Sequence, residues 1–208
     1  VIHYVHSNEI KDMGGLRKFM PITHLTFLIA CLAIAGVPPF SGFFSKEEIL
    51  LAAYHSSMIV YVIALLTSAL TAFYMFRLYF SIFWNKQSEL HNDHGEGTFS
   101  MKLPLIILAV CTIGVGFIPF GHFVSTDGKA LETPLHLMFS IAPVLIGLTG
   151  IAIAMWMYKK ESNKPQQVST ALGGLYTAAY HKFYMDELYL FITKKVVFNL
   201  IGRPAAWV

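Results

Sequence analysis

The residues most able to do chemistry lie in the run GVPPFSGFFSKEEIL, where Lys46 precedes Glu47 and Glu48. Inside a membrane, desolvation and the positive end of a helix favour a neutral lysine amine, whereas neighbouring carboxylates favour the ammonium. Near such a balance, a small movement of charge or water can move the proton, and ionisable residues inside membranes commonly serve as proton relays. The simple alternative is that Lys46 reaches the far interface as an anchor and both carboxylates lie in headgroup water.

The backbone before this lysine is predicted to be a broken membrane helix. The helix is expected to enter at Pro21, because proline suits a first turn, and to run to Ala35. Proline removes a backbone donor and clashes with the preceding turn, so two prolines after a glycine predict non-helical backbone. Such backbone is tolerated inside a membrane only where it is buried in protein or lines a hydrated cavity. The residues assigned to the break are Gly36, Pro38, Pro39 and Gly42.

The helix is expected to restart with its own cap. Ser45 and Glu48 have the S-x-x-E spacing of a capping box, in which the serine caps a free backbone N–H and the glutamate reaches back to the serine N–H. This spacing predicts that Lys46 lies in the first turn of the second half-helix, roughly two thirds of the way across the membrane at about 1.5 Å per residue.

The composition indicates a membrane protein. Only 13 % of the residues are charged and 55 % are hydrophobic, whereas a soluble domain has roughly 25 % charged residues. The mean hydropathy is +0.57. The chain opens without methionine on VIHYVH, which resembles the tail of an apolar helix, and stops at RPAAWV, so we expect a fragment of a longer protein.

A window of about 20 residues, the length that crosses the hydrocarbon core, predicts an all-α polytopic membrane protein. It has about four transmembrane helices, the first discontinuous at Pro38 and Pro39, and an amphipathic C-terminal segment. Residues 161–170 are expected to form a polar linker. The predicted divisions are 1–19 (the end of a preceding helix and a loop), 20–56 (the discontinuous helix), 57–158 (three further helices) and 159–208 (linker and amphipathic segment).

The basic residues predict the orientation, because loops rich in Lys and Arg stay in the cytoplasm. If each apolar block crosses once, segments 7–19, 85–102 and 159–164 share one side, which would be cytoplasmic, or matrix in a mitochondrion. The opposite loops contain only Lys129. Because these cations flank membrane segments and form no stripe, nucleic acid is not an expected partner.

The remaining polar residues allow two interpretations each. His24 either touches a hydrated path or is a hydrogen-bonded packing residue, and Arg77 is expected to be an anchor or a salt-bridge partner. Thr67, Ser68 and Thr71 either polarise one helix face or allow close helix packing.

No metal site is predicted. The loop LHNDHGEG (residues 90–97) contains His and acidic residues, but zinc sites need better-defined ligands on ordered elements, so a solvated connector is expected. Cys31 and Cys111 both sit inside apolar blocks and are expected to be buried packing residues.

Three runs carry a resemblance to a known family: DMGGLRKFMPITHLTFLIACLAIAGVPPFSGFFSKEEIL, TAFYMFRLYF (71–80) and HKFYMDELY (181–189). In this order they resemble the L subunit of respiratory complex I, the NADH:quinone oxidoreductase, whose mitochondrial equivalent is subunit 5. The resemblance spans nearly the whole chain and implies an antiporter-like, proton-translocating subunit of the membrane arm. Lys46 matches the terminal lysine of the family's proton path, and Glu47 stands where the family usually has aspartate.

The resemblance also implies partners and a location. NADH, FMN, iron–sulfur clusters and quinone are expected on other subunits, and no cofactor on this chain. Residues 189–208 would begin a lateral helix that runs along neighbouring antiporter-like subunits, and lipids are further partners. The implied location is the bacterial inner membrane or the mitochondrial inner membrane. The alternatives are a subunit of a multisubunit cation (Na⁺)/proton antiporter, which shares the broken helix, and a purely structural scaffold.

Overall fold

The computed structural model describes residues 1–85, 95–118 and 137–202, and every regular element in these ranges is helical. The chain divides into two compact units, Val1–Ser162 and Asn163–Val208. The all-α prediction is therefore confirmed. The helices of the first unit are α1 (Ile2–Val5), η1 (Ile10–Asp12), η2 (Leu16–Lys18), α2 (Pro21–Ala35), α3 (Ser41–Ser56), α4 (Met58–Phe83), α5 (Phe99–Gly114), η3 (Val115–Phe117) and α7 (Leu137–Tyr158).

Three helices are long and apolar enough to cross a membrane: Met58–Phe83, Phe99–Phe117 and Phe139–Tyr158. Their 26, 19 and 20 residues match the roughly 20 residues that span the hydrocarbon core. The helix Pro21–Ala35 is apolar but shorter. Together with the predicted break that follows it, this agrees with three complete spans and one discontinuous span in an integral membrane protein.

The outer faces of the helices are apolar. On α4, large side chains recur at helical spacing and remain more than half exposed within the chain: Ile59, Ile63, Leu66 and Leu70. A stripe of this kind is unusual on a soluble monomer, but it suits contact with lipid tails or with neighbouring helices.

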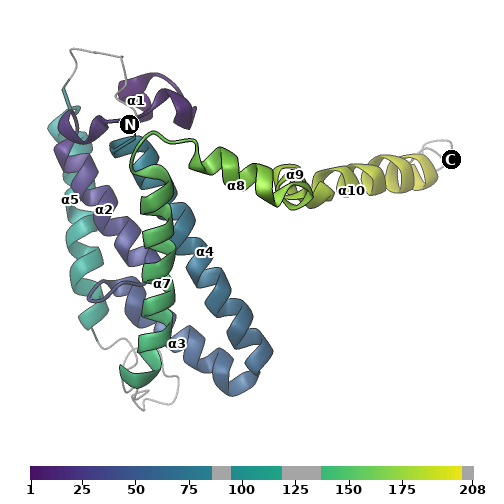
Figure 1. Ribbon diagram of the computed structural model, residues 1–208, viewed down its shortest axis with the longest axis horizontal. Helices are drawn as coiled ribbons and strands as arrows, with labels where there is room; N and C mark the ends of the chain where they lie inside the picture. The colour runs from purple at the N-terminus through teal and green to yellow at the C-terminus, as the bar shows by residue number, and fades with distance from the viewer. Residues whose placement is uncertain (86–94, 119–136, 203–208) are drawn as a thin grey trace. The chain divides into compact units, whose positions relative to one another are not determined.

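Helix α4 packs against α7, α2 and α3, and α2 also packs against α5 (Figure 1). The α4–α7 contact is close because Gly150 has no side chain: a Cβ atom there would lie 2.6 Å from the carbonyl oxygen of Ala69. Small residues that let backbones approach are typical of packed membrane helices. The buried core is rich in aromatic residues from the last turns of α4, namely Phe76, Tyr79, Phe80 and Phe83.

The predicted break is present between α2 and α3. Helix α2 ends at Ala35, and Gly36 takes the left-handed conformation with φ 77°. The Gly36 N–H donates to the Ala33 carbonyl at 3.0 Å and the Val37 N–H to the Leu32 carbonyl at 3.1 Å. This pair of bonds is the Schellman motif, which satisfies the last carbonyls of a helix and favours glycine at the left-handed position.

The predicted capping box is wrong. Helix α3 begins at Ser41 after Phe40, and among the described residues no side chain caps its start. Ser45 lies inside the helix, where its hydroxyl donates to the Gly42 carbonyl at 3.3 Å. The helix begins five residues earlier than expected, so Lys46 lies in the second turn and not the first. The S-x-x-E pattern misled because serine inside a helix readily bonds to its own backbone.

The second unit contains α8 (Lys164–Leu172), α9 (Gly174–Tyr180), η4 (Lys182–Tyr184), α10 (Met185–Phe191) and η5, a π-helix (Ile192–Gly202). Within the polar linker expected at 161–170, a helix starts at Lys164, with proline in its first turn. The chain bends at η4, whose three residues have φ between 52° and 58°. Lys182 then forms an ion pair of 2.6 Å with Asp186.

Candidate functional site

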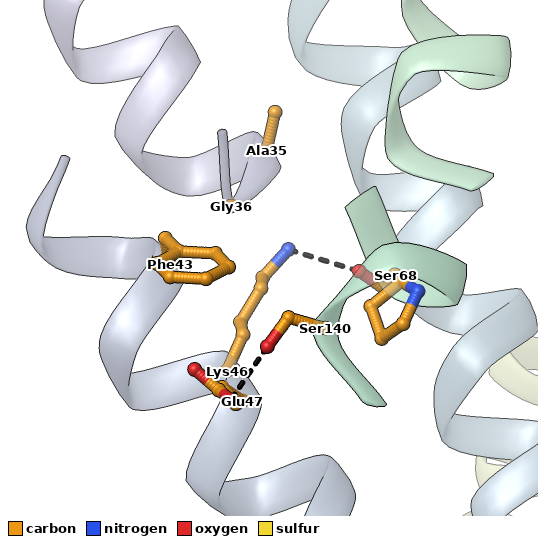
Figure 2. Close-up of a pocket in the computed structure, with 8 residues that line it drawn as sticks. Ala35, Gly36, Phe43, Lys46, Glu47, Ser68 and Ser140 are labelled. Atoms are coloured by element: carbon orange, nitrogen blue, oxygen red, sulfur yellow. Dashed lines mark hydrogen bonds between the residues drawn. The ribbon is translucent and has the colours of Figure 1, made fainter. Parts of the chain in front are cut away.

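Lys46 lies in α3, directly beneath the end of α2. Its aliphatic stem runs beside Gly36, where an added Cβ would come within 2.9 Å of the Lys46 Cδ. The ammonium Nζ donates to the hydroxyl oxygen of Ser68 on α4 at 3.3 Å (Figure 2). The break thus leaves room for the lysine stem, and the lysine head is held by the neighbouring helix.

Glu47 is buried, with only 4 % of its surface exposed. Its Oε1 accepts a hydrogen bond of 2.5 Å from the hydroxyl of Ser140 on α7, which is itself buried (Figure 2). A buried carboxylate is costly unless it is hydrogen-bonded or paired, and a charge-assisted bond from a hydroxyl is a strong one. Glu48, the next residue, is exposed.

Lys46 and Glu47 border one small cavity, which brings together the end of α2, α3, α4 and α7. Its volume, 10 Å³, is about that needed to hold one water molecule. The two charged groups and two serine hydroxyls supply enough polar partners for that water. The lining residues are Ala35, Gly36, Phe43, Lys46, Glu47, Ser68, Ser140 and Pro143.

The two serines give the cavity a specific chemistry. A hydroxyl carries one donor and two acceptor positions, so Ser68 can accept from the lysine ammonium and still pass its own proton onward. Ser140 donates to Glu47 and keeps acceptor capacity. The arrangement therefore joins an amino group, a carboxyl group and two hydroxyls, each able to donate and accept, around a water-sized space.

The four residues assigned to the break differ in what they do. Gly36 supplies the left-handed turn, and the Pro38–Pro39 peptide bond is cis. Gly42 faces the backbone of α2: an added Cβ would lie 1.8 Å from the Ala33 carbonyl oxygen. Gly42 is thus required for the close approach of α3 to α2, which places Lys46 beside Gly36.

His24 does not border this cavity. Its Nε2 is hydrogen-bonded to the Tyr79 hydroxyl at 2.7 Å, and its ring stacks on Tyr79 and meets Phe83 edge to face. The Tyr79 hydroxyl also accepts a bond of 3.1 Å from the indole N–H of Trp84. These contacts agree with the hydrogen-bonded packing alternative for His24.

Of the three hydroxyl residues noted on α4, only Ser68 reaches the cavity. Thr67 and Thr71 donate to carbonyls of their own helix, Ile63 and Thr67 respectively. Ser140 was not singled out from the sequence, because a lone serine within an apolar block is common and its bond to Glu47 crosses 93 positions. Only the packing of α7 against α3 identifies Ser140 as a partner of Glu47.

Arg77 and the two cysteines lie away from this cavity. Arg77 places its guanidinium 5.4 Å from the centre of the Tyr158 ring. Cys31 is buried, as expected, but Cys111 is exposed on α5, so the prediction of burial was wrong for that residue. Its helix is exposed on most sides within this chain.

The loop considered for a metal lies largely outside the described residues, from 90 to 94. Glu96 of that loop is described, and its Oε1 accepts a 2.5 Å bond from the backbone N–H of Thr23 in the first turn of α2. This is a helix N-terminus capped by a distant carboxylate. Within the described ranges, no group of three or more His, Cys, Asp or Glu residues is arranged to hold a metal ion.

Comparison with known proteins gives a consistent set of relatives. A family described as "NADH:quinone oxidoreductase/Mrp antiporter, TM" matches residues 1–71. A "NAD(P)H-quinone oxidoreductase chain 5" from Picosynechococcus sp. is 35 % identical over 219 residues, which cover 89 % of this chain and 33 % of the relative. A chloroplastic "NAD(P)H-quinone oxidoreductase subunit 5" from Chlorokybus atmophyticus is 36 % identical, covering 85 % of this chain and 30 % of the relative.

A third relative is the "NADH-quinone oxidoreductase subunit L" of Neisseria meningitidis, 32 % identical over 242 residues. The alignment covers 94 % of this chain and 36 % of that protein. The chain thus spans about a third of the length of the curated relatives it matches. In each case the similarity extends well beyond the broken helix, over most of the present sequence.

Proposed function

Because the chain belongs to the family of NAD(P)H-quinone oxidoreductase chain 5 and NADH-quinone oxidoreductase subunit L, we propose that it is an antiporter-like, proton-translocating part of such an oxidoreductase. The observation that supports this most directly is the Lys46–Ser68 contact beside the water-sized cavity at the helix break. An ionisable residue held inside a membrane by a broken helix is a functional site by default.

The proposed proton transfer uses Lys46 as the titrating group. In the ammonium form Lys46 donates to Ser68. When Ser68 takes this proton and passes its own hydroxyl proton to a water in the cavity, Lys46 becomes an amine that can accept from a water or from Ser68. Direct transfers of this kind occur over about 2.6–3.2 Å, and the Lys46–Ser68 distance of 3.3 Å is just above that range, so a small approach of the two groups brings them within reach.

Glu47 has an electrostatic role in this proposal. A carboxylate fixed by Ser140 at the same cavity stabilises the charged form of the neighbouring lysine, because opposite charges attract strongly where water is scarce. Any change in the distance between the two groups would alter how tightly Lys46 holds its proton. Of the two interpretations of His24, the proposal uses the packing one, because the described partners of His24 lie outside the cavity.

The redox chemistry is assigned to other subunits. The chain has two cysteines, fewer than the four thiolates of an iron–sulfur cluster, and no glycine loop opening a nucleotide-binding helix. We therefore propose that NADH, FMN, iron–sulfur clusters and quinone bind elsewhere in the complex. The proposed partners are other membrane-arm subunits, with residues 189–208 on the neighbouring antiporter-like subunit, and lipids, in a bacterial or mitochondrial inner membrane.

A cation/proton antiporter subunit is the second candidate, because the matching family description names the Mrp antiporter as well. That match, however, ends at residue 71. The relatives that also match the second unit are named as quinone oxidoreductases, which favours the first candidate.

Two neutralising substitutions with a matched control test the proposal. In membranes containing the full-length protein, Lys46→Met keeps the aliphatic stem and removes the charge, and Glu47→Gln removes the buried carboxylate. Glu48→Gln makes the same change at the exposed neighbour. We expect NADH-driven acidification per NADH oxidised to fall several-fold in the first two variants and to stay unchanged in Glu48→Gln.

The alternatives give different results in the same assay. If acidification and NADH oxidation both persist in Lys46→Met, the lysine is an anchor. If only the amount of assembled complex falls, the chain is a scaffold. If sodium tolerance of the cells changes while NADH oxidation does not depend on this protein, the antiporter assignment is correct.

A further inference from the structure

Trp84 lies between two cations that come from distant parts of the chain. The Arg17 guanidinium carbon is 4.0 Å from the centre of the indole ring, and the Lys159 ammonium is 5.1 Å from it. The indole is fixed in place because its N–H donates to the Tyr79 hydroxyl. Trp84 follows the last residue of α4, and Lys159 follows the last residue of α7, so these contacts mark the ends of two membrane-spanning helices.

A third cation–aromatic contact lies next to these two. Arg77 of α4 lies over the ring of Tyr158, the residue immediately before Lys159. Arg77 and Trp84 are two turns apart on one helix, about 10 Å along its axis. We call Arg17, Arg77 and Lys159, with the rings of Trp84 and Tyr158, the basic interfacial cluster.

The cluster carries three positive charges without a described counter-charge. No carboxylate of residues 1–85, 95–118 or 137–202 lies within ion-pair distance of any of the three cations. Cation–π contacts hold the side chains in place but leave their net charge uncompensated. At the boundary of a membrane, where water is partly excluded, uncompensated cations are costly and attract an anion.

We propose that the basic interfacial cluster binds the headgroup phosphate of an anionic phospholipid. Three features support this ligand. Tryptophan and tyrosine are the residues that favour the headgroup level of a membrane. Arginine and lysine are the side chains that bind phosphate. The cluster also extends along the helix axis for about 10 Å, so one lipid can place its phosphate near Arg17 and Lys159 while Arg77 reaches up from the acyl region.

The test uses the full-length protein within its complex, in vesicles of phosphatidylcholine that contain a minor share of dibrominated phosphatidylglycerol. Bromine quenches tryptophan fluorescence at close contact, and the difference between the parent and Trp84→Phe isolates the signal of Trp84. We expect stronger quenching of Trp84 by brominated phosphatidylglycerol than by the same share of brominated phosphatidylcholine. In the double variant Arg17→Gln/Lys159→Gln, the preference of Trp84 for phosphatidylglycerol over phosphatidylcholine should fall by roughly five-fold for each cation removed.

Two controls separate binding from a change in fold. Arg17→Lys keeps the charge and should retain most of the preference, whereas Lys102→Gln removes a basic residue of α5 outside the cluster and should retain all of it. Equal quenching by the two lipids, or a preference that survives the double substitution, would overturn the proposal. Loss of the preference on addition of inorganic phosphate would also overturn it, because the site would then bind free phosphate. The same holds if the preference arises only after neighbouring subunits are removed, because a protein would then occupy the site in the complex.

Discussion

Ser140 and Glu47, which are 93 positions apart in the chain, are joined by a hydrogen bond of 2.5 Å in the buried contact between α7 and α3. The bond holds the Glu47 carboxylate at the cavity that Lys46 also lines, and α7 thereby becomes part of the site. A change in how α7 packs would move the Glu47 carboxylate relative to Lys46. The last membrane-spanning helix of the first unit can thus influence the charge balance at the break.

The first prediction concerns this bond. Ser140→Ala removes the donor to a buried carboxylate, and we expect it to lower the free energy of unfolding by about 1–3 kcal/mol. We also expect less acidification per NADH oxidised, because the carboxylate is no longer held at the cavity. Denaturant unfolding of the purified full-length protein and the acidification assay measure the two effects. Ser140→Thr, which keeps the hydroxyl, should restore both. Thr149→Ala on the same helix should change neither, because the described hydrogen bond of the Thr149 hydroxyl is to the Ile146 carbonyl of its own helix.

The sequence predicted the positions that depend on local chemistry. Proline at position 21 begins α2, glycine at position 36 ends it, and the two following prolines separate the half-helices, because each residue restricts its own backbone. The same local reasoning failed for Ser45. Its hydroxyl can either cap a free backbone N–H at the start of a helix or donate to a carbonyl one turn earlier, and it does the second. Polar composition also did not indicate that residues from Lys164 onward form a helix.

The sequence did not predict which residues contact Lys46, Glu47 and Arg17. Ser68 was noted as one of three hydroxyl residues on α4, but only the rotation of α4 against α3 selects it. Ser140 and the contacts of Arg17 depend on helices that meet after long stretches of chain. A single sequence contains no signal for such pairs, because helix periodicity gives the face of a residue but not the neighbour.

The second prediction concerns the hydroxyl shared by His24 and Trp84. Tyr79→Phe leaves His24 Nε2 and the Trp84 indole N–H without their described partner. We expect the free energy of unfolding to fall by about 1–3 kcal/mol, while acidification per NADH oxidised stays at the parent value. A normal stability with a reduced acidification ratio would contradict this and would place His24 in the proton path.

The third prediction concerns the orientation of the helices. The contacts of Trp84 with Arg17 and Lys159 bring the segments that precede α2 and follow α4 and α7 to one face. A membrane-impermeant maleimide should therefore label Lys18→Cys and Lys160→Cys from the same side, the cytoplasm, and His55→Cys from the other. The parent protein measures the background from Cys31 and Cys111, which lie within apolar helices. Labelling of Lys18→Cys and Lys160→Cys from opposite sides would refute the arrangement.

The fourth prediction tests whether the close approach of α3 to α2 is required at the break. An alanine Cβ at position 42 would lie 1.8 Å from the Ala33 carbonyl oxygen, far inside contact distance, and backbone cannot yield as a flexible side chain does. We expect Gly42→Ala to separate the half-helices, and the amount of assembled complex on a native gel should fall several-fold. Gly114→Ala is the matched control, because an added Cβ there meets no atom within 4 Å.

In that control the only expected effect is the ordinary gain of about 0.5–1 kcal/mol for alanine over glycine in a helix. If Gly42→Ala assembles as well as Gly114→Ala, the contact between Gly42 and Ala33 does not determine the position of α3. The break alone leaves the second half-helix free to shift along the first. Another contact would then have to hold Lys46 near Ser68. A reduced assembly of Gly42→Ala, with Gly114→Ala at the parent level, instead ties the placement of Lys46 to a single glycine four residues before it.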